Sequence, residues 1–163
     1  MNNQVTFSNK DIEMKNLNTQ LCKAKLLNFD TWITGYYACR QETTYCCKQD
    51  YQRYPVMTRH YIMRDEMTDW GLPNILRAYE IDINTLCRCT GCHDRNGKLI
   101  FENDILNGEL YNVVSYGNGE NEFLGMNVGW YTQRDNFESW CELGDPEEYE
   151  VTGNILEDNL KKS

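Results

Sequence analysis

The sequence predicts a mainly β protein of the α+β class, a small twisted β-barrel or sandwich of short antiparallel strands with a partly helical N-terminal segment. Short runs of aromatic and β-branched residues recur at close spacing along most of the chain. Asn-Gly pairs separate such runs in the second half, and Asn-Gly favours the two positive φ values of a type I′ hairpin turn. These pairs are Asn96-Gly97, Asn107-Gly108 and Asn118-Gly119.

The first segment, residues 1–29, is expected to lie outside a β domain that spans residues 30–163. It is polar, and one helix is expected over Ser8–Leu27 because apolar residues recur there near the spacing of a helix face. Asparagines between them oppose the helix. The apolar residues are Ile12, Leu17, Leu21 and Leu26.

Within the β domain, strands are expected over residues 31–40 and 56–63, where aromatic and β-branched residues gather. A polar connection over 41–55 joins them, and a loop containing glycine and proline follows over 64–74. The run 75–89 contains a strand-like alternation, of Ala78, Glu80 and Asp82 with Tyr79, Ile81 and Ile83. A meander of further strands is then expected over residues 98–106, 109–117, 122–133 and 148–156.

The region Tyr79–Leu106 contains a series of turn, strand and carboxylate elements that resembles the central motif of the YopX family of phage and prophage proteins. In order, its elements are Thr90-Gly91, Asp94-Arg95-Asn96-Gly97-Lys98, Ile100-Phe101 and Glu102-Asn103-Asp104-Ile105. Two flanking elements are similar to the family as well. They are the Trp32, Gly35 and Tyr36 strand with His60-Tyr61-Ile62 as its partner, and the ending formed by Val151, Gly153, Asn154 and Ile155.

This resemblance implies a phage accessory protein of undefined biochemistry, and no catalytic residue is attached to the family motif. The chain departs from the family pattern at three positions. Cys89 and Cys92 flank Thr-Gly where the family has apolar residues, and Asn103 stands where the family has glycine. A different local backbone is therefore expected at Asn103.

Charge is distributed unevenly along the chain, whose formal net charge is -9. Residues 91–163 hold five Lys and Arg against fifteen Asp and Glu, and the stretch 135–158 has nine acids and no Lys or Arg. Such a surface repels phosphates, so direct nucleic-acid binding is not expected. It suits either a solvated face or a docking surface for a protein partner with a basic groove, such as a host nuclease complex.

A compact group of possible metal ligands is the strongest chemical signal in the sequence. Cys89 and Cys92 have the spacing of a zinc knuckle, and Cys87 or His93 is a candidate third ligand for Zn²⁺. A fourth ligand would come from Cys39, Cys46 or Cys47. The alternative is that these cysteines are reduced thiols filling the core, as expected for Cys22 and Cys141.

Catalysis has little support in the sequence, and we expect no enzyme. The only histidines are His60 and His93, and pairing Cys47 with His60 would leave the histidine without an orienting third group. Haem attachment at Cys89–His93 would require export, and the polar N-terminus does not resemble a signal peptide. A thioredoxin-like site is not expected, because the Cys-x-x-Cys precedes a hairpin rather than a helix.

No apolar run in the sequence is long enough to span a membrane, and we expect the protein in the cytoplasm of a bacterial host cell. Two functions follow from the pattern. The first is a phage interaction protein whose acidic half binds a basic protein, as an anti-CRISPR-like inhibitor would. The alternative is a zinc-binding structural or assembly module, for which a homo-oligomer is also considered.

Overall fold

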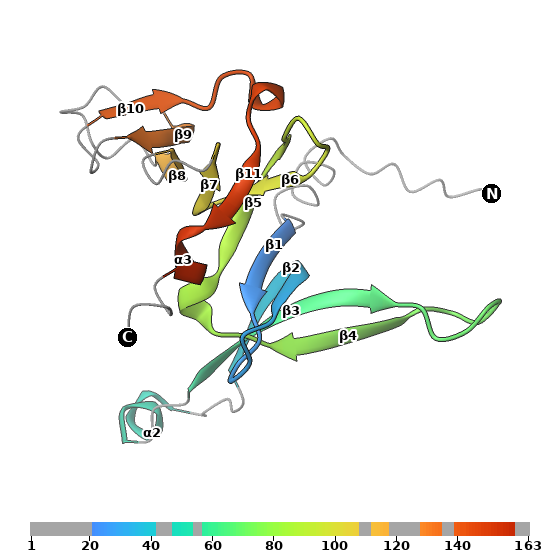
Figure 1. Ribbon diagram of the computed structural model, residues 1–163. Coiled ribbons are helices and arrows are strands. Elements are labelled where there is room, and N and C mark those ends of the chain that lie inside the picture. The colour runs from blue at the N-terminus through green and yellow to red at the C-terminus, as the bar shows by residue number, and fades with distance from the viewer. Residues whose placement is uncertain are drawn as a thin grey trace, which may run out of the picture. The chain divides into compact units, whose positions relative to one another are not determined.

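A computed structural model describes residues 21–41, 47–53, 57–107, 112–117, 128–134 and 139–158. The chain divides into two compact units, Met1–Leu86 and Cys87–Ser163, which we describe separately. The described elements are short strands with a few short helices, drawn in Figure 1. The predicted mainly β class is therefore confirmed.

The first unit contains a four-stranded antiparallel sheet in the order β4-β3-β2-β1. The register places Gly35 of β2 opposite Cys22 of β1, and Cys39 of β2 opposite His60 of β3. The strands are β1 (Leu21–Lys25), β2 (Trp32–Gln41), β3 (Thr58–Glu66) and β4 (Ile75–Glu80). Two short helices accompany the sheet, α2 (Lys48–Arg53) and the 3₁₀ helix η1 (Ile83–Thr85).

The sheet of the first unit curls until its two ends meet. An antiparallel bridge joins Leu26, just after β1, to Ile81, just after β4, and the Leu27 N–H donates to the Glu80 carbonyl at 3.0 Å. The result is a small, partly closed barrel, in line with the predicted architecture. Its core contains five buried side chains: Cys22, Ala24, Ile33, Ile62 and Ile81.

Beyond the barrel, β3 and β4 continue as a two-stranded arm (Figure 1). The last residue of β3 that pairs with β2 is Met63, whereas pairing between β3 and β4 runs on from Arg64↔Arg77 to Glu66↔Ile75. We call residues 64–77 the arm. Its side chains have no third strand to pack against within the described part of this unit.

The second unit contains a hairpin, β5-β6, and a five-stranded antiparallel sheet in the order β10-β9-β8-β7-β11. Its core consists of Ile100, Leu106, Val114 and Val151, with Trp130 packed against them. The strands are β5 (Cys87–His93), β6 (Leu99–Phe101), β7 (Asp104–Leu106), β8 (Val113–Gly117), β9 (Gly129–Arg134), β10 (Ser139–Glu142) and β11 (Val151–Asn154). The helices are the 3₁₀ helix η4 (Pro146–Glu148) and α3 (Ile155–Asp158).

The structure differs from several of the local elements expected from the sequence. The helix expected over Ser8–Leu27 is wrong for its end, because Leu21–Lys25 form β1, while its residues up to 20 lie outside the described residues. The polar connection contains α2, and β3 extends three residues into the expected loop. A separate segment over residues 1–29 stays a prediction, as does a turn at Asn118-Gly119, which lies outside the described residues.

Candidate interaction surface

The family motif contains a tight hairpin turn between β5 and β6. The Gly97 N–H donates to the Asp94 carbonyl at 2.9 Å, and the Asp94 N–H donates to the Lys98 carbonyl at 2.8 Å. Gly97 has φ +76° whereas Asn96 does not have a positive φ. The expected type I′ turn is therefore wrong, and the hairpin is instead the three-residue type that places glycine in the left-handed position.

Asp94 links this hairpin to the C-terminal strand. Its carboxylate accepts from the N–H groups of Asn96 at 2.9 Å and Lys98 at 2.8 Å, and from the N–H of Val151 in β11 at 3.0 Å. These donors, the Val151 N–H above all, hold the pKa of Asp94 below its ordinary value. The motif aspartate is thus a structural acceptor.

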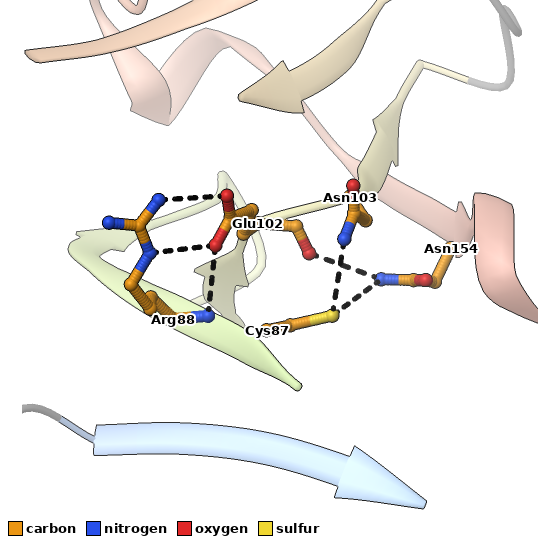
Figure 2. A network of polar contacts seen from close by, with 5 residues as sticks. All are labelled: Cys87, Arg88, Glu102, Asn103 and Asn154. Atoms are coloured by element: carbon orange, nitrogen blue, oxygen red, sulfur yellow. Dashed lines mark hydrogen bonds and ion pairs between the residues drawn. The ribbon is translucent and has the colours of Figure 1, made fainter. Parts of the chain in front are cut away.

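A second buried link joins Asp104, at the start of β7, to Asn154, at the end of β11. The Asn154 amide donates to the Asp104 carboxylate at 2.8 Å and to the Glu102 carbonyl at 3.4 Å. It also reaches the Cys87 sulfur at 4.0 Å, as Figure 2 shows. Because Asp104 further accepts from the Phe101 N–H at 2.8 Å, both motif side chains are occupied in building the fold.

Asn103, the departure from the family glycine, has φ +66°. This is the left-handed region that glycine enters freely and that asparagine tolerates better than most residues. Its N–H donates to the Val114 carbonyl at 2.8 Å, and its side chain donates to the Cys87 sulfur at 3.6 Å (Figure 2). Asparagine is therefore compatible with the positive-φ backbone that the family glycine suggests.

Arg88 of β5 makes a further side-chain link in this region, to Glu102 just after β6. Its guanidinium pairs with both carboxylate oxygens of Glu102, at 2.8 and 2.9 Å (Figure 2). The same group lies over the rings of Tyr116 and Trp130, at 4.5 and 5.4 Å from their centroids. Its charge is neutralised inside the unit.

The predicted zinc ligands all lie on β5 but in different environments. Cys87 and Cys89 are buried, Cys92 is half-buried against the core, and His93 is exposed. A register shift falls between Cys89 and His93, and Gly91 there has a positive φ. Burial raises the pKa of the Cys89 thiol.

No group of three or more Cys, His, Asp or Glu side chains is gathered as a metal site within the part of the chain that the structure describes. Cys39 and Cys47 are exposed, and Cys46 lies outside that part. Zinc binding, with or without these three as further ligands, stays a prediction. The core interpretation holds for Cys22, which is buried, whereas Cys141 is half-buried and shares a hydrogen bond with Thr132 at 3.0 Å.

Cys47 and His60, the pair considered for catalysis, each have another partner in the structure. His60 Nδ1 lies 2.7 Å from the Tyr37 hydroxyl, and the two rings stack. The Cys47 thiol donates to Asp50 at 3.2 Å. Burial is the largest cause that raises the pKa of Tyr37.

Most carboxylates in the described part of the acidic stretch lie in or beside the connection between β10 and β11. We call residues 142–150 the acidic loop. Leu143 and Tyr149 of this loop pack against the second core, and the Leu143 N–H donates to the Trp130 carbonyl at 3.1 Å. At the other end, Asn107 donates its N–H to the Glu150 carbonyl at 2.7 Å and accepts from the Glu150 N–H at 3.0 Å. Both ends of the loop are therefore fixed.

Between these anchors the loop exposes its carboxylates. Asp145, Glu147 and Glu148 are exposed there, as is Glu142 at the end of β10, and none of the four has an ion-pair partner among the described side chains. Glu150 differs because Arg95 neutralises it. The unit Cys87–Ser163 holds six Lys and Arg against fifteen Asp and Glu, a net charge of -9, whereas Met1–Leu86 holds ten of each. The whole net charge of the chain therefore belongs to the second unit.

The sequence identifies the acids but not the anchors that fix them, which lie far away in sequence. Tyr149 could have been recognised from its apolar character within an acidic run, but the role of Asn107 depends on tertiary pairing. Of the aromatics expected either as core or as a binding face, Trp130 packs against the core and Tyr131 is half-buried. Phe137 and the side chain of Trp140 lie outside the described residues.

None of the helices in the described ranges is long and apolar enough to cross a membrane.

A family model described as YopX protein matches residues 30–160, which is most of the chain. No curated protein and no solved structure matches the sequence significantly. The match includes both links described above, from Asp94 to Val151 and from Asp104 to Asn154. The chain therefore belongs to the YopX family and is a phage-type protein.

Proposed function

We propose that this protein is a non-enzymatic interaction protein whose acidic loop binds a basic groove of a nucleic-acid-handling protein in the cytoplasm of the bacterial host. The observation that carries the proposal is the fixed loop with four exposed carboxylates and no neutralising partner among the described side chains. A loop held at both ends loses little conformational entropy on binding. Its charges can therefore act on a partner without first being ordered.

The charge distribution supports the same proposal. Arg88 is paired with Glu102 and Arg95 with Glu150, so neither arginine offsets the four exposed carboxylates of the loop. A concentrated negative field accelerates association with a positively charged surface and makes binding sensitive to salt. The same field disfavours contact with phosphates.

The partner class follows from this chemistry. A channel that holds a nucleic-acid backbone presents rows of Lys and Arg, which attract spaced carboxylates as they attract phosphates. A host defence nuclease is therefore the proposed target, and its inhibition would make the protein anti-CRISPR-like. The phage-type family is consistent with such a role.

The test uses purified CRISPR effector nucleases and the full chain in a binding assay at low and high salt. Glu147→Lys/Glu148→Lys should weaken binding at least tenfold, while Asp50→Lys/Asp65→Lys makes the same charge change at exposed positions of the first unit. Equal losses in both variants would attribute binding to net charge alone. No salt-sensitive binding to any basic nuclease would overturn the proposal.

The zinc-binding assembly module is the alternative, favoured by the placement of Cys87, Cys89 and Cys92 on one strand. It requires deprotonation of Cys89, whose pKa burial raises. Elemental analysis of protein purified without chelator tests it against Cys89→Ser/Cys92→Ser. One zinc per chain that disappears in the variant supports the module, and a metal-free wild type sinks it.

A further inference from the structure

A pocket of about 580 Å³ opens beside β3 in the first unit. It lies where β3 runs past the end of β4, because β4 stops at Glu80, opposite Tyr61, whereas β3 begins at Thr58. Beyond Glu80 the chain turns into η1 instead of continuing beside β3, and the Asp82 N–H donates to the Lys25 carbonyl at 3.0 Å. The volume falls in the range of small-molecule sites, about 300–1,000 Å³.

Aliphatic side chains form one part of the lining. Met57 is 79% exposed, Leu27 is 39% exposed and Ile83 is 38% exposed, whereas Ile81 is buried. Covering such groups with an apolar ligand removes them from water and is favourable. This part of the pocket therefore suits the apolar body of a ligand.

The charges in the lining leave one carboxylate without a counter-charge. Arg59 and Glu80 neutralise each other through an ion pair at 3.1 Å. Asp82 is half-buried and has no ion-pair partner among the described side chains. His60 also lines the pocket, and its Nδ1 lies 2.7 Å from the Tyr37 hydroxyl. A cationic ligand would balance Asp82, whereas an anion would be repelled by it.

Two carboxylate oxygens of the lining have no hydrogen-bond partner within the described part of the chain. Asp82 accepts from the N–H and the side-chain amide of Asn84 with Oδ1 alone, both at 3.0 Å, which leaves Oδ2. Glu80 accepts from Arg59 with Oε2, which leaves Oε1. A neutral apolar ligand would take water from these oxygens without replacing its hydrogen bonds, which is costly.

The main chain of β3 supplies a third acceptor. The His60 carbonyl faces β4 and accepts from the Ile81 N–H at 3.0 Å. Alternation directs the main-chain groups of Thr58 to the same side, past the last residue of β4. The Thr58 carbonyl thus faces the pocket together with the two carboxylates. A primary ammonium group carries three donors and no acceptor, which matches these three acceptors.

We propose that this pocket binds a primary aliphatic ammonium compound. The ammonium group binds the three open acceptors, and the alkyl chain lies along the exposed aliphatic side chains. The pocket belongs to the first unit, so the proposal is independent of the acidic loop.

The first experiment follows the methionine methyl resonances of the ¹³C-labelled full chain while n-hexylammonium chloride is added at physiological salt. The Met57 methyl, assigned with Met57→Leu, should shift to saturation, whereas Met67 on the arm should not. Hexanoate and 1-hexanol should bind about tenfold more weakly, because neither makes charge-assisted bonds to the carboxylates. Each methylene removed from the amine should weaken binding about fourfold.

The second experiment repeats the hexylammonium titration on two charge variants. Asp82→Asn keeps the Oδ1 acceptor for Asn84 but removes the charge, and it should weaken binding about tenfold. Asp65→Asn makes the same change at an exposed position of the arm and should leave binding unchanged. Circular dichroism confirms that both variants fold.

A third titration separates the two sources of such a group. Nα-acetyl-lysine methylamide carries the same ammonium on a peptide-like body. Tighter binding of this compound than of hexylammonium assigns the pocket to a lysine side chain of a partner, and weaker binding assigns it to a free amine. The absence of a saturable shift at Met57, equal binding of hexanoate, or equal effects of the two charge variants would overturn the proposal.

Discussion

Asn154 donates its side-chain amide to Asp104 at 2.8 Å, and both residues are almost wholly buried although they stand fifty positions apart. This bond joins the central family motif to the C-terminal family element. The two elements that identify the family are therefore one physical structure. Their role in folding accounts for both residues without a catalytic function.

The coupling between these two residues can be measured. Asp104→Ala removes the carboxylate that accepts from the Phe101 N–H and is the nearest acceptor of the Asn154 amide, and it should lower the free energy of unfolding by about 3 kcal/mol. Asn154→Ala should cost about 2 kcal/mol. Urea denaturation of the single and double variants should give a coupling energy of about 1 kcal/mol, and additive effects would contradict the bond.

Asp94 should make the stability of the protein depend on acid pH. Its folded pKa lies below the ordinary value of 3.8 because of the Val151, Lys98 and Asn96 N–H donors. Its contribution is therefore present above that value and is lost as the pH falls towards the folded pKa. Asp94→Asn should lower the Tm at pH 7, and the difference from wild type should narrow below pH 3.8.

A control for this profile is Asp65→Asn, which changes an exposed aspartate of the first unit. Thermal melts between pH 7 and pH 2.5 should show no comparable narrowing for it. A Tm difference for Asp94→Asn that is the same at every pH would show that the carboxylate charge is unimportant for the link to β11.

Gly35 should not tolerate a side chain. A Cβ there would lie 2.5 Å from the Met63 carbonyl oxygen and 2.8 Å from an Ile62 methyl group, inside the curled sheet. Gly35→Ala should lower the free energy of unfolding by about 1–3 kcal/mol. Gly153→Ala is the matched strand control, because its Cβ would meet Ile105 at an ordinary 3.9 Å.

Asn103 should accept glycine but not a β-branched residue. Asn103→Gly retains the positive φ and loses only the weak contact with Cys87, so its stability should change by less than about 1 kcal/mol. Asn103→Val should cost about 2 kcal/mol, because valine is strained in the left-handed region. Chemical denaturation compares the two, and equal stability of both variants would contradict the backbone assignment.

Much of the β structure could be predicted from local patterns. Aromatic and β-branched residues mark β2, and the family resemblance pairs it with the strand that contains His60. The strand β1 was harder to predict. Leu21 and Leu26 fit a helical spacing as well as a strand, and pairing with Trp32–Tyr36 decides between them. The arm lacks the alternation of apolar and polar residues that marks a half-buried strand, because both of its faces are exposed.

The candidate sites could likewise be predicted only in part from the sequence. Composition identifies the acidic stretch, but the contacts that fix its ends come from Trp130 and Asn107. The spacing of Cys89 and Cys92 is compatible with zinc, whereas the direction of each thiol depends on the shift near Gly91. Such features arise from pairing between strands and have no local signature in the sequence.

The links from β11 to Asp94 and Asp104 also bear on the order in which the protein can fold during synthesis. The barrel of the first unit closes between Leu26 and Ile81, so all of its described strands leave the ribosome early. The second unit needs Val151 and Asn154, near the end of the chain, before its buried carboxylates find their donors. The nascent unit therefore cannot complete these links before β11 has left the ribosome, and truncation before β11 would leave two buried acids without those donors.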